Sequence, residues 1–173
     1  IPELQEGTHR AKASGILPNG KPVVVNADGT VSVVAGASGA EGTATTYNSA
    51  ATKYPNSVYD TANNKVVFAY GDDNVGNAIV GTISGTSISF GSEVRFNPTF
   101  SSLYVDSVYD PDSGKIVIVY RDGGTQGECV IGTVSGTSIS FGTPVTFNSG
   151  ATTWCKVAYD TTNNKVVIAY KDD

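Results

Sequence analysis

The stretch SVYDPDSGKIVIVY, residues 107–120, occurs in three related copies in this chain. The other two are SVYDTANNKVVFAY at 57–70 and KVAYDTTNNKVVIAY at 156–170, so equivalent residues stand fifty positions apart. In every copy, two runs of β-branched and aromatic residues flank a short cluster of Asp, Asn, Ser and Gly. Such runs around turn-forming residues predict an antiparallel β-hairpin. A hairpin repeated at a constant interval indicates a repeat protein built from β-sheets.

A second predicted hairpin follows each of the first two copies. It reads GTISGTSISFGSEVRF at 81–96 and GTVSGTSISFGTPVTF at 132–147, with Ser-Gly-Thr as its turn. Each unit therefore contains four predicted strands, which in the second unit cover 103–110, 115–121, 128–134 and 138–147. The strand over 115–121 is apolar on both faces, as expected where neighbouring sheets cover both sides.

Four strands in about 50 residues match the length of one β-propeller blade. The predicted fold class is therefore all-β, with four-stranded antiparallel blade repeats arranged as in a propeller. Residues 1–20 show no β alternation, so we expect a linker or docking arm there. The repeat domain then covers 21–173: a divergent half-blade with a loop at 21–50, repeats at 51–100 and 101–150, and a half repeat at 151–173.

The two ends of the repeat domain are offset by half a unit. The head, VVVNADGTVSVVA at 23–35, is interpreted as a divergent copy of the second hairpin, whereas the last unit contains only the first hairpin. One end could thus complete a blade begun by the other. Three blades are fewer than the four to eight of known propellers, so we expect a partial ring or one completed by oligomerisation.

Charge and composition narrow the class of partner. The net charge is −5 with an isoelectric point near 4.7, and no basic stripe exists to neutralise phosphates, which argues against nucleic acid. No apolar run approaches the ~18 residues of a membrane span. Cys129 and Cys155 align with Ala78 and Val105 of the preceding unit, so we expect buried free thiols rather than a disulfide framework.

One aromatic residue recurs at the start of the first strand of each repeat: Tyr54, Tyr104 and Trp154. Rings repeated once per blade could stack on sugars, because they combine a flat apolar face with a polar edge. Packing between neighbouring blades is the alternative, since it also needs one large side chain per repeat. The series is the best candidate ligand-binding site in the sequence.

Two series of aspartates share the same spacing. Asp60, Asp110 and Asp160 open the turn of the first hairpin, where turn formation is favoured over a ring of cation ligands. A second series, Asp72, Asp122 and Asp172, follows the second strand of each repeat, with Arg121 and Lys171 beside it. We expect these residues to form either a charged binding rim or polar loop tips that keep the edge soluble.

Catalytic chemistry is not indicated. His9 is the sole histidine and lies in the predicted linker. The sequence contains no recognisable Ser or Cys nucleophile motif for which it could act as the base. The spacings of known metal sites and of phosphate-binding loops are also missing from the sequence. A carboxylate pair for glycoside hydrolysis would be expected to break the repeat, whereas every well-placed Asp here follows it. We therefore expect no enzyme, no cofactor and no metal.

The head ASGILPNGKPVVVNADGTVSVVA (13–35) and the repeats YDTTNNKVVIAY and GTVSGTSISFGTPVTF resemble long repetitive virion or tail-fibre-like proteins of marine tailed phages. The repeats are also similar in size to kelch units, although the kelch glycine doublet is missing. The resemblance covers nearly all of the chain after residue 13 and carries no catalytic motif. It implies an extracellular or virion location and partners among other copies or virion proteins.

Two functions therefore remain open. The first is a non-enzymatic structural or adhesive component of an extracellular assembly, such as a phage tail or tail fibre that mediates assembly or host attachment. The alternative is a carbohydrate-binding, lectin-like β-propeller that recognises a surface glycan. Neither reading needs membrane insertion.

Overall fold

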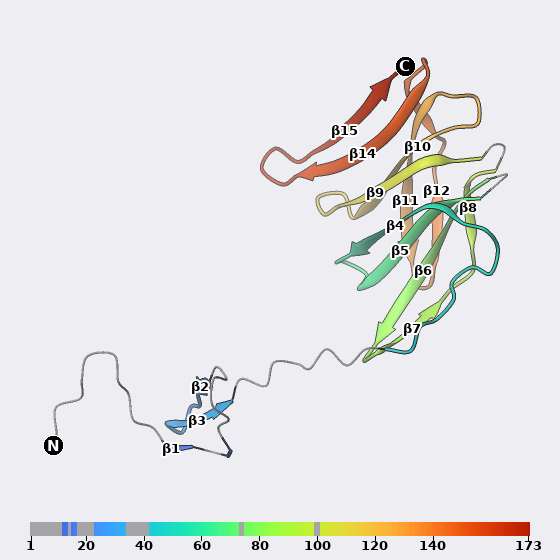
Figure 1. The fold of residues 1–173 in the computed structure, drawn as a ribbon. Coiled ribbons are helices and arrows are strands. Elements are labelled where there is room, and N and C mark those ends of the chain that lie inside the picture. Colours follow the sequence, from blue (N-terminus) through green and yellow to red (C-terminus); the bar gives the residue numbers. More distant parts are fainter. Residues whose placement is uncertain (1–11, 14, 17–22, 34–41, 73–74, 99–100) are drawn as a thin grey trace. The chain divides into compact units, whose positions relative to one another are not determined.

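The computed structural model describes residues 12–13, 15–16, 23–33, 42–72, 75–98 and 101–173 (Figure 1). Every regular element in these residues is a β-strand, which confirms the all-β class. Accordingly, the described part of the chain contains no helix that is long and apolar enough to cross a membrane. The chain divides into two compact units, 1–41 and 42–173, which are described separately.

The first unit contains a three-stranded sheet of β1 (Lys12–Ala13), β2 (Val23–Val25) and β3 (Thr30–Val33). β2 and β3 form an antiparallel hairpin, and β1 pairs with β3 in parallel. The hairpin turn is closed by Asp28, whose carboxylate accepts a hydrogen bond from the Thr30 amide at 3.0 Å, while Gly29 adopts a positive φ of 79°. The predicted linker over 1–20 thus includes the short strand β1; most of its other residues, His9 among them, lie outside the described residues.

The second unit contains three antiparallel sheets, one for each copy of the repeated hairpin. The first sheet comprises β4 (Lys53–Asp60), β5 (Lys65–Gly71), β6 (Gly76–Ser84), β7 (Ser87–Phe90) and β8 (Val94–Asn97). The second comprises β9 (Leu103–Asp110), β10 (Lys115–Arg121), β11 (Gly127–Ser135), β12 (Ser138–Phe141) and β13 (Val145–Asn148). The third comprises β14 (Thr152–Asp160) and β15 (Lys165–Asp172).

The prediction of one continuous fourth strand over 138–147 is wrong. This segment forms two short strands, β12 and β13, which pair with different parts of β11, and β7 and β8 divide the first sheet in the same way. The break falls at 142–144 and, in the first sheet, at 91–93, where no proline is present, so the missing amide of Pro144 is not required for it. Each complete sheet is therefore five-stranded.

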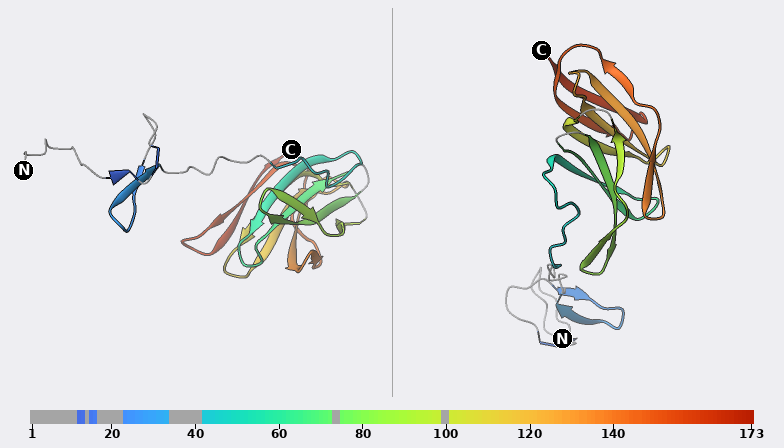
Figure 2. Two further views of the ribbon diagram at one scale, coloured as in Figure 1. Left: turned by 90° about the horizontal axis from the view of Figure 1, so that it is seen from below. Right: turned by 90° about the vertical axis from the view of Figure 1, so that its right-hand side faces the viewer.

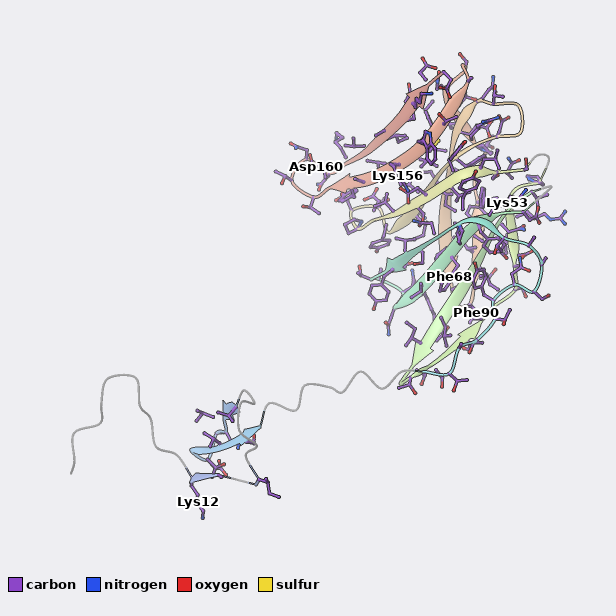
Figure 3. All side chains as sticks on the ribbon, viewed as in Figure 1. Lys12, Lys53, Phe68, Phe90, Lys156 and Asp160 are labelled. Carbon is purple, nitrogen blue, oxygen red and sulfur yellow. The ribbon has the colours of Figure 1, made fainter. Side chains whose placement is uncertain are left out.

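The turns of the first hairpins are built by aspartates, as the sequence predicts. Asp110 accepts hydrogen bonds from the amides of Asp112 and Ser113 and from the Ser113 hydroxyl, at 3.0, 3.3 and 2.7 Å. Asp60 and Asp160 make the same pattern with their own turns. Hydrogen bonds from Ser113 lower the pKa of Asp110, and those from Asn163 lower the pKa of Asp160. Figure 3 shows Asp160 at the tip of its hairpin.

The first strands of the three sheets, β4, β9 and β14, lie side by side (Figures 1 and 2). The main core lies between the first and second sheets, where the alternating side chains of β5 and β10 are buried. Phe96 of β8 is only 2% exposed and packs on two rings of the second sheet, Tyr120 and Phe141, at centroid distances of 5.1 and 5.9 Å. One aromatic residue of the first sheet thus locks it onto the second.

A similar aromatic contact joins the second sheet to the third, with one ring pair in place of two. Phe147 of β13 packs on Tyr170 of β15 at 5.2 Å. In the part of the chain that the structure describes, β15 pairs only with β14, and its side chains Val167 and Tyr170 are 54% and 42% exposed. The described residues do not form a closed ring.

Candidate aromatic binding site

The candidate site begins with an irregularity in the first strand of every sheet. Lys53 and Asn56 pair with Gly71 and Ala69, so β4 carries one residue more than β5 over this stretch. The same shift occurs between β9 and β10 and between β14 and β15. An extra residue in one strand is a β-bulge, which bends the strand and redirects a side chain. The bulge therefore recurs once per repeat.

The aromatic series occupies these bulges in a strained backbone conformation. Tyr54, Tyr104 and Trp154 have φ angles of 52°, 53° and 56°. Glycine is the usual residue in this left-handed region, and a large L side chain there costs about 1–2 kcal/mol. The sequence nevertheless places an aromatic residue there three times. Strain that is retained at equivalent positions is typical of functional sites.

The three rings form a continuous row across the sheets, which we call the aromatic ladder. The Tyr54 and Tyr104 centroids are 4.9 Å apart, and those of Tyr104 and Trp154 are 5.1 Å apart, with tilts of 47° and 46°. Tyr54 is 40% exposed and Trp154 is 65% exposed. The rings therefore pack on one another between sheets, as the packing interpretation requires. Tyr54 and Trp154 also expose surface to solvent, as the binding interpretation requires.

A hollow of about 190 Å³ lies along the aromatic ladder. Its walls are contributed by all three first strands: Tyr54, Pro55, Asn56, Tyr104, Val105, Trp154, Cys155 and Lys156. Figure 3 shows Lys156 on β14. Aromatic walls with a few polar groups are the usual composition of a ligand site.

Polar side chains two positions after the rings connect the three sheets beside the hollow. Asn56 donates to Asp106 at 2.6 Å and accepts from the Ser107 hydroxyl. The other oxygen of Asp106 accepts from the Val157 amide at 3.1 Å and lies 3.6 Å from the Lys156 ammonium. Asp106 is 8% exposed, so these partners offset the cost of burying its carboxylate. The network holds the strands that carry the ladder in place.

In the second aspartate series, Asp72 and Asp122 bond within the loops that follow their strands, whereas Asp172 bonds to the preceding sheet. Asp72 accepts from the Val75 amide at 2.7 Å and from the Asn77 side chain at 3.1 Å, and Asp122 accepts from the Gln126 amide at 2.8 Å. Asp172 accepts from Asn148 at 2.8 Å. The first two aspartates close the connections that follow β5 and β10, and the third joins β15 to β13.

The two basic residues predicted beside these aspartates lie apart from the hollow's lining. Lys171 forms an ion pair with Asp173 on the surface of the third sheet. Arg121 pairs across the sheet with Leu103, next to a ladder position, and among the described residues its buried Nε has no hydrogen-bond partner. No group of three potential metal ligands occurs within the described ranges.

Both cysteines are free thiols, with Cys155 buried and Cys129 half-buried. Burial raises the pKa of the Cys155 thiol to about 11 and also raises that of Cys129. Because the thiolate is the reactive species, both groups are poor nucleophiles at neutral pH.

We expect Cys155 to resist alkylation in the folded chain. At pH 8 roughly one such thiol in a thousand is ionised, and its sulfur is shielded. Iodoacetamide should modify it at least about tenfold more slowly in the native chain than in urea, measured by mass spectrometry of the Cys155 peptide. Labelling at the same rate in both conditions would show that the thiol is accessible.

Sequence reasoning missed two elements of the site. The network through Asn56, Asp106 and Lys156 was not predicted, because these residues differ in type although they are fifty positions apart. Nor were the locking residues Phe96 and Phe147, which stand in the segment predicted to continue the fourth strand. Their signal was present as a repeated aromatic two residues after a valine.

No protein family, curated protein or solved structure matches this chain. The functional argument therefore rests on the geometry of the site.

Proposed function

We propose that this chain is a non-enzymatic structural and adhesive component of an extracellular assembly, comparable to a phage tail or tail-fibre protein. The observation that carries the proposal is the aromatic ladder: three neighbouring rings in strained bulges on three packed sheets, with Tyr54 and Trp154 exposed and Tyr104 half-buried between them. A surface of this kind suits attachment, because the exposed groups are large and apolar.

The sheets are proposed to be successive blades of a propeller-like scaffold. Two features support this reading: the first strands lie next to one another, and a ring of the first sheet packs on the second as a ring of the second packs on the third. The exposed side chains of β15 correspond to side chains of β10 that are buried in the second sheet. We infer that additional repeats or another copy cover β15, since an uncovered apolar edge favours association.

A role without catalysis is favoured by how the carboxylates are used. The aspartates that recur at equivalent positions accept hydrogen bonds from turn amides and side chains. Each therefore stabilises a turn, and the same arrangement is made several times, whereas a catalytic pair acts at a single place.

Adhesion is tested by incubating the fluorescently labelled chain with intact cells from a panel of marine bacteria. We expect saturable binding to at least one strain and a loss of about tenfold on Tyr104→Ala, because the central ring contacts both others. Tyr59→Ala is the matched control: Tyr59 is 49% exposed on β4 but lies outside the ladder.

Two outcomes would contradict the adhesive role. One is a panel on which the chain shows no saturable binding. The other is binding that Tyr104→Ala and Tyr59→Ala leave equally strong. The alternative function, lectin-like carbohydrate binding, is favoured by the exposure of Tyr54 and Trp154 beside the hollow.

A further inference from the structure

Building on the proposed adhesive role, we propose that the aromatic ladder binds a neutral linear polysaccharide, with consecutive sugar units stacked on Tyr54, Tyr104 and Trp154. A pyranose ring has an apolar face of C–H groups that stacks on aromatic rings, and a rim of hydroxyls that hydrogen-bonds to polar groups. The ladder offers both kinds of partner in one row.

The rings of the ladder have free hydrogen-bonding groups. Within the described residues, the Tyr54 and Tyr104 hydroxyls and the Trp154 indole N–H make no hydrogen bond to the protein. Tyrosine hydroxyls and indole N–H groups that pack in cores usually find a protein partner, so these are left for solvent or a ligand. Sugar hydroxyls can both donate to and accept from such groups.

The spacing and tilt of the rings favour a polymer with rotatable linkages. Neighbouring centroids are 4.9 and 5.1 Å apart, which is comparable to the length of one sugar unit in an extended chain. The tilts of 47° and 46° prevent a flat, rigid ligand from lying on all three rings. A polysaccharide can turn at each glycosidic bond and follow them.

A proline-rich peptide, the other polymer that docks on aromatic grooves, fits this spacing less well. A polyproline II helix presents equivalent side chains once per turn, about every 9 Å. That period is nearly twice the distance between neighbouring rings. Such a peptide would contact alternate rings and leave Tyr104 unused.

Electrostatics favour a neutral ligand. The whole chain has a net charge of −5, which disfavours a polyanion. Lys156 is the charged residue in the wall of the hollow, and its ammonium lies 3.6 Å from the Asp106 carboxylate. This pairing offsets the local positive charge, while Asp106 in turn is saturated by Asn56 and the Val157 amide. Neither an anionic nor a cationic ligand finds an unpaired countercharge there.

Trp154 allows a direct test, because it is the sole tryptophan of the chain and reports on the ladder by its fluorescence. The probes are linear oligosaccharides of one to about six units derived from β-1,4-glucan, β-1,4-mannan and α-1,4-glucan. For at least one series we expect a saturable change in emission. Affinity should rise about tenfold per added unit up to three and little beyond, because the ladder has three rings.

Variants identify the surface that binds. Tyr104→Ala should weaken binding of the trisaccharide at least about tenfold, whereas Tyr59→Ala should leave it unchanged. Native circular dichroism and thermal midpoints show that each variant is folded. If Tyr104→Ala destabilises the chain, Tyr104→Leu retains bulk without the aromatic face and should still lose binding.

Three results would overturn the proposal. The first is no change in Trp154 emission with any neutral oligosaccharide series. The second is sugar binding that depends neither on chain length nor on Tyr104. The third is binding of a polyproline peptide, in place of sugars, that depends on Tyr104. If cell adhesion depends on Tyr104 while all neutral oligosaccharides fail, the ligand class is wrong and the adhesive role stands. If adhesion is also independent of Tyr104, both proposals fail.

Discussion

Replacing Gly91 with alanine is expected to lower the thermal midpoint of this chain by about 10 °C, whereas the same change at Gly142 is expected to have little effect. The two glycines occupy equivalent positions, each just after the short strand β7 or β12. Their amides make equivalent hydrogen bonds, to the Val80 and Ile131 carbonyls at 2.9 and 3.0 Å. The difference between them lies in what each faces.

Gly91 faces the hairpin of the next sheet. A Cβ atom at this position would lie 1.8 Å from the Thr137 carbonyl oxygen, a backbone atom that cannot rotate away. A Cβ at Gly142 would have the Ile131 oxygen, at 4.0 Å, as its nearest neighbour. Forcing a methyl group into a filled contact typically costs about 1–3 kcal/mol, or more where backbone must move. For a chain of this size, each kcal/mol lowers the midpoint by about 2–4 °C.

Thermal unfolding of both variants, followed by circular dichroism at several scan rates, measures the effect. Equal midpoints for Gly91→Ala and Gly142→Ala would show that the first and second sheets do not approach as closely as described. A large drop in the thermal midpoint from Gly142→Ala alone would contradict the description of Gly142 as open to solvent and Gly91 as packed against the next sheet.

Truncating Phe96 to alanine is expected to destabilise the chain by about 3–5 kcal/mol, the usual cost of emptying a buried phenylalanine site. Phe96 is 2% exposed and packs on Tyr120 and Phe141 of the next sheet. Its removal leaves a cavity at the junction of two sheets, and that site cannot collapse without moving a whole sheet.

Phe147→Ala provides the matched comparison. Phe147 holds the same place in the following repeat but is only partly buried and contacts the single ring of Tyr170. We expect a loss of less than half that of Phe96→Ala, and almost no loss from Val145→Ala, which is 61% exposed on the same strand as Phe147. Urea unfolding gives the three free energies. Equal losses at Phe96 and Phe147 would contradict the idea that packing depth differs between the two junctions.

The regular part of the fold could be predicted from the sequence, because local preference and repetition agree there. The strand predicted over 115–121 is β10, and the turn predicted at Ser113-Gly114 has Gly114 at a positive φ of 67°. The break between β12 and β13 was not predicted, because the alternation of apolar residues continues through it, and the equivalent break between β7 and β8 has no proline to mark it. Repetition alone does not reveal where a strand stops pairing.

The candidate site could be predicted only in part. The fifty-residue spacing singled out Tyr54, Tyr104 and Trp154, whose rings lie next to one another in the structure. Their left-handed backbone could not be predicted, since intrinsic preference opposes a bulky side chain there and only tertiary contacts stabilise it. Whether the rings were buried or exposed also depended on how neighbouring sheets approach, which no local pattern encodes.

The bulge that carries each ring has a consequence for how such a chain can evolve. Because every repeat brings its own bulge and its own ring, an in-frame duplication of one repeat adds a ring at the same time as it adds a sheet. The number of rings in the row then follows the number of repeats, and no separate mutation is needed to add one. A lineage could lengthen or shorten the row of rings by unequal recombination between the related copies, while point mutations change one ring at a time.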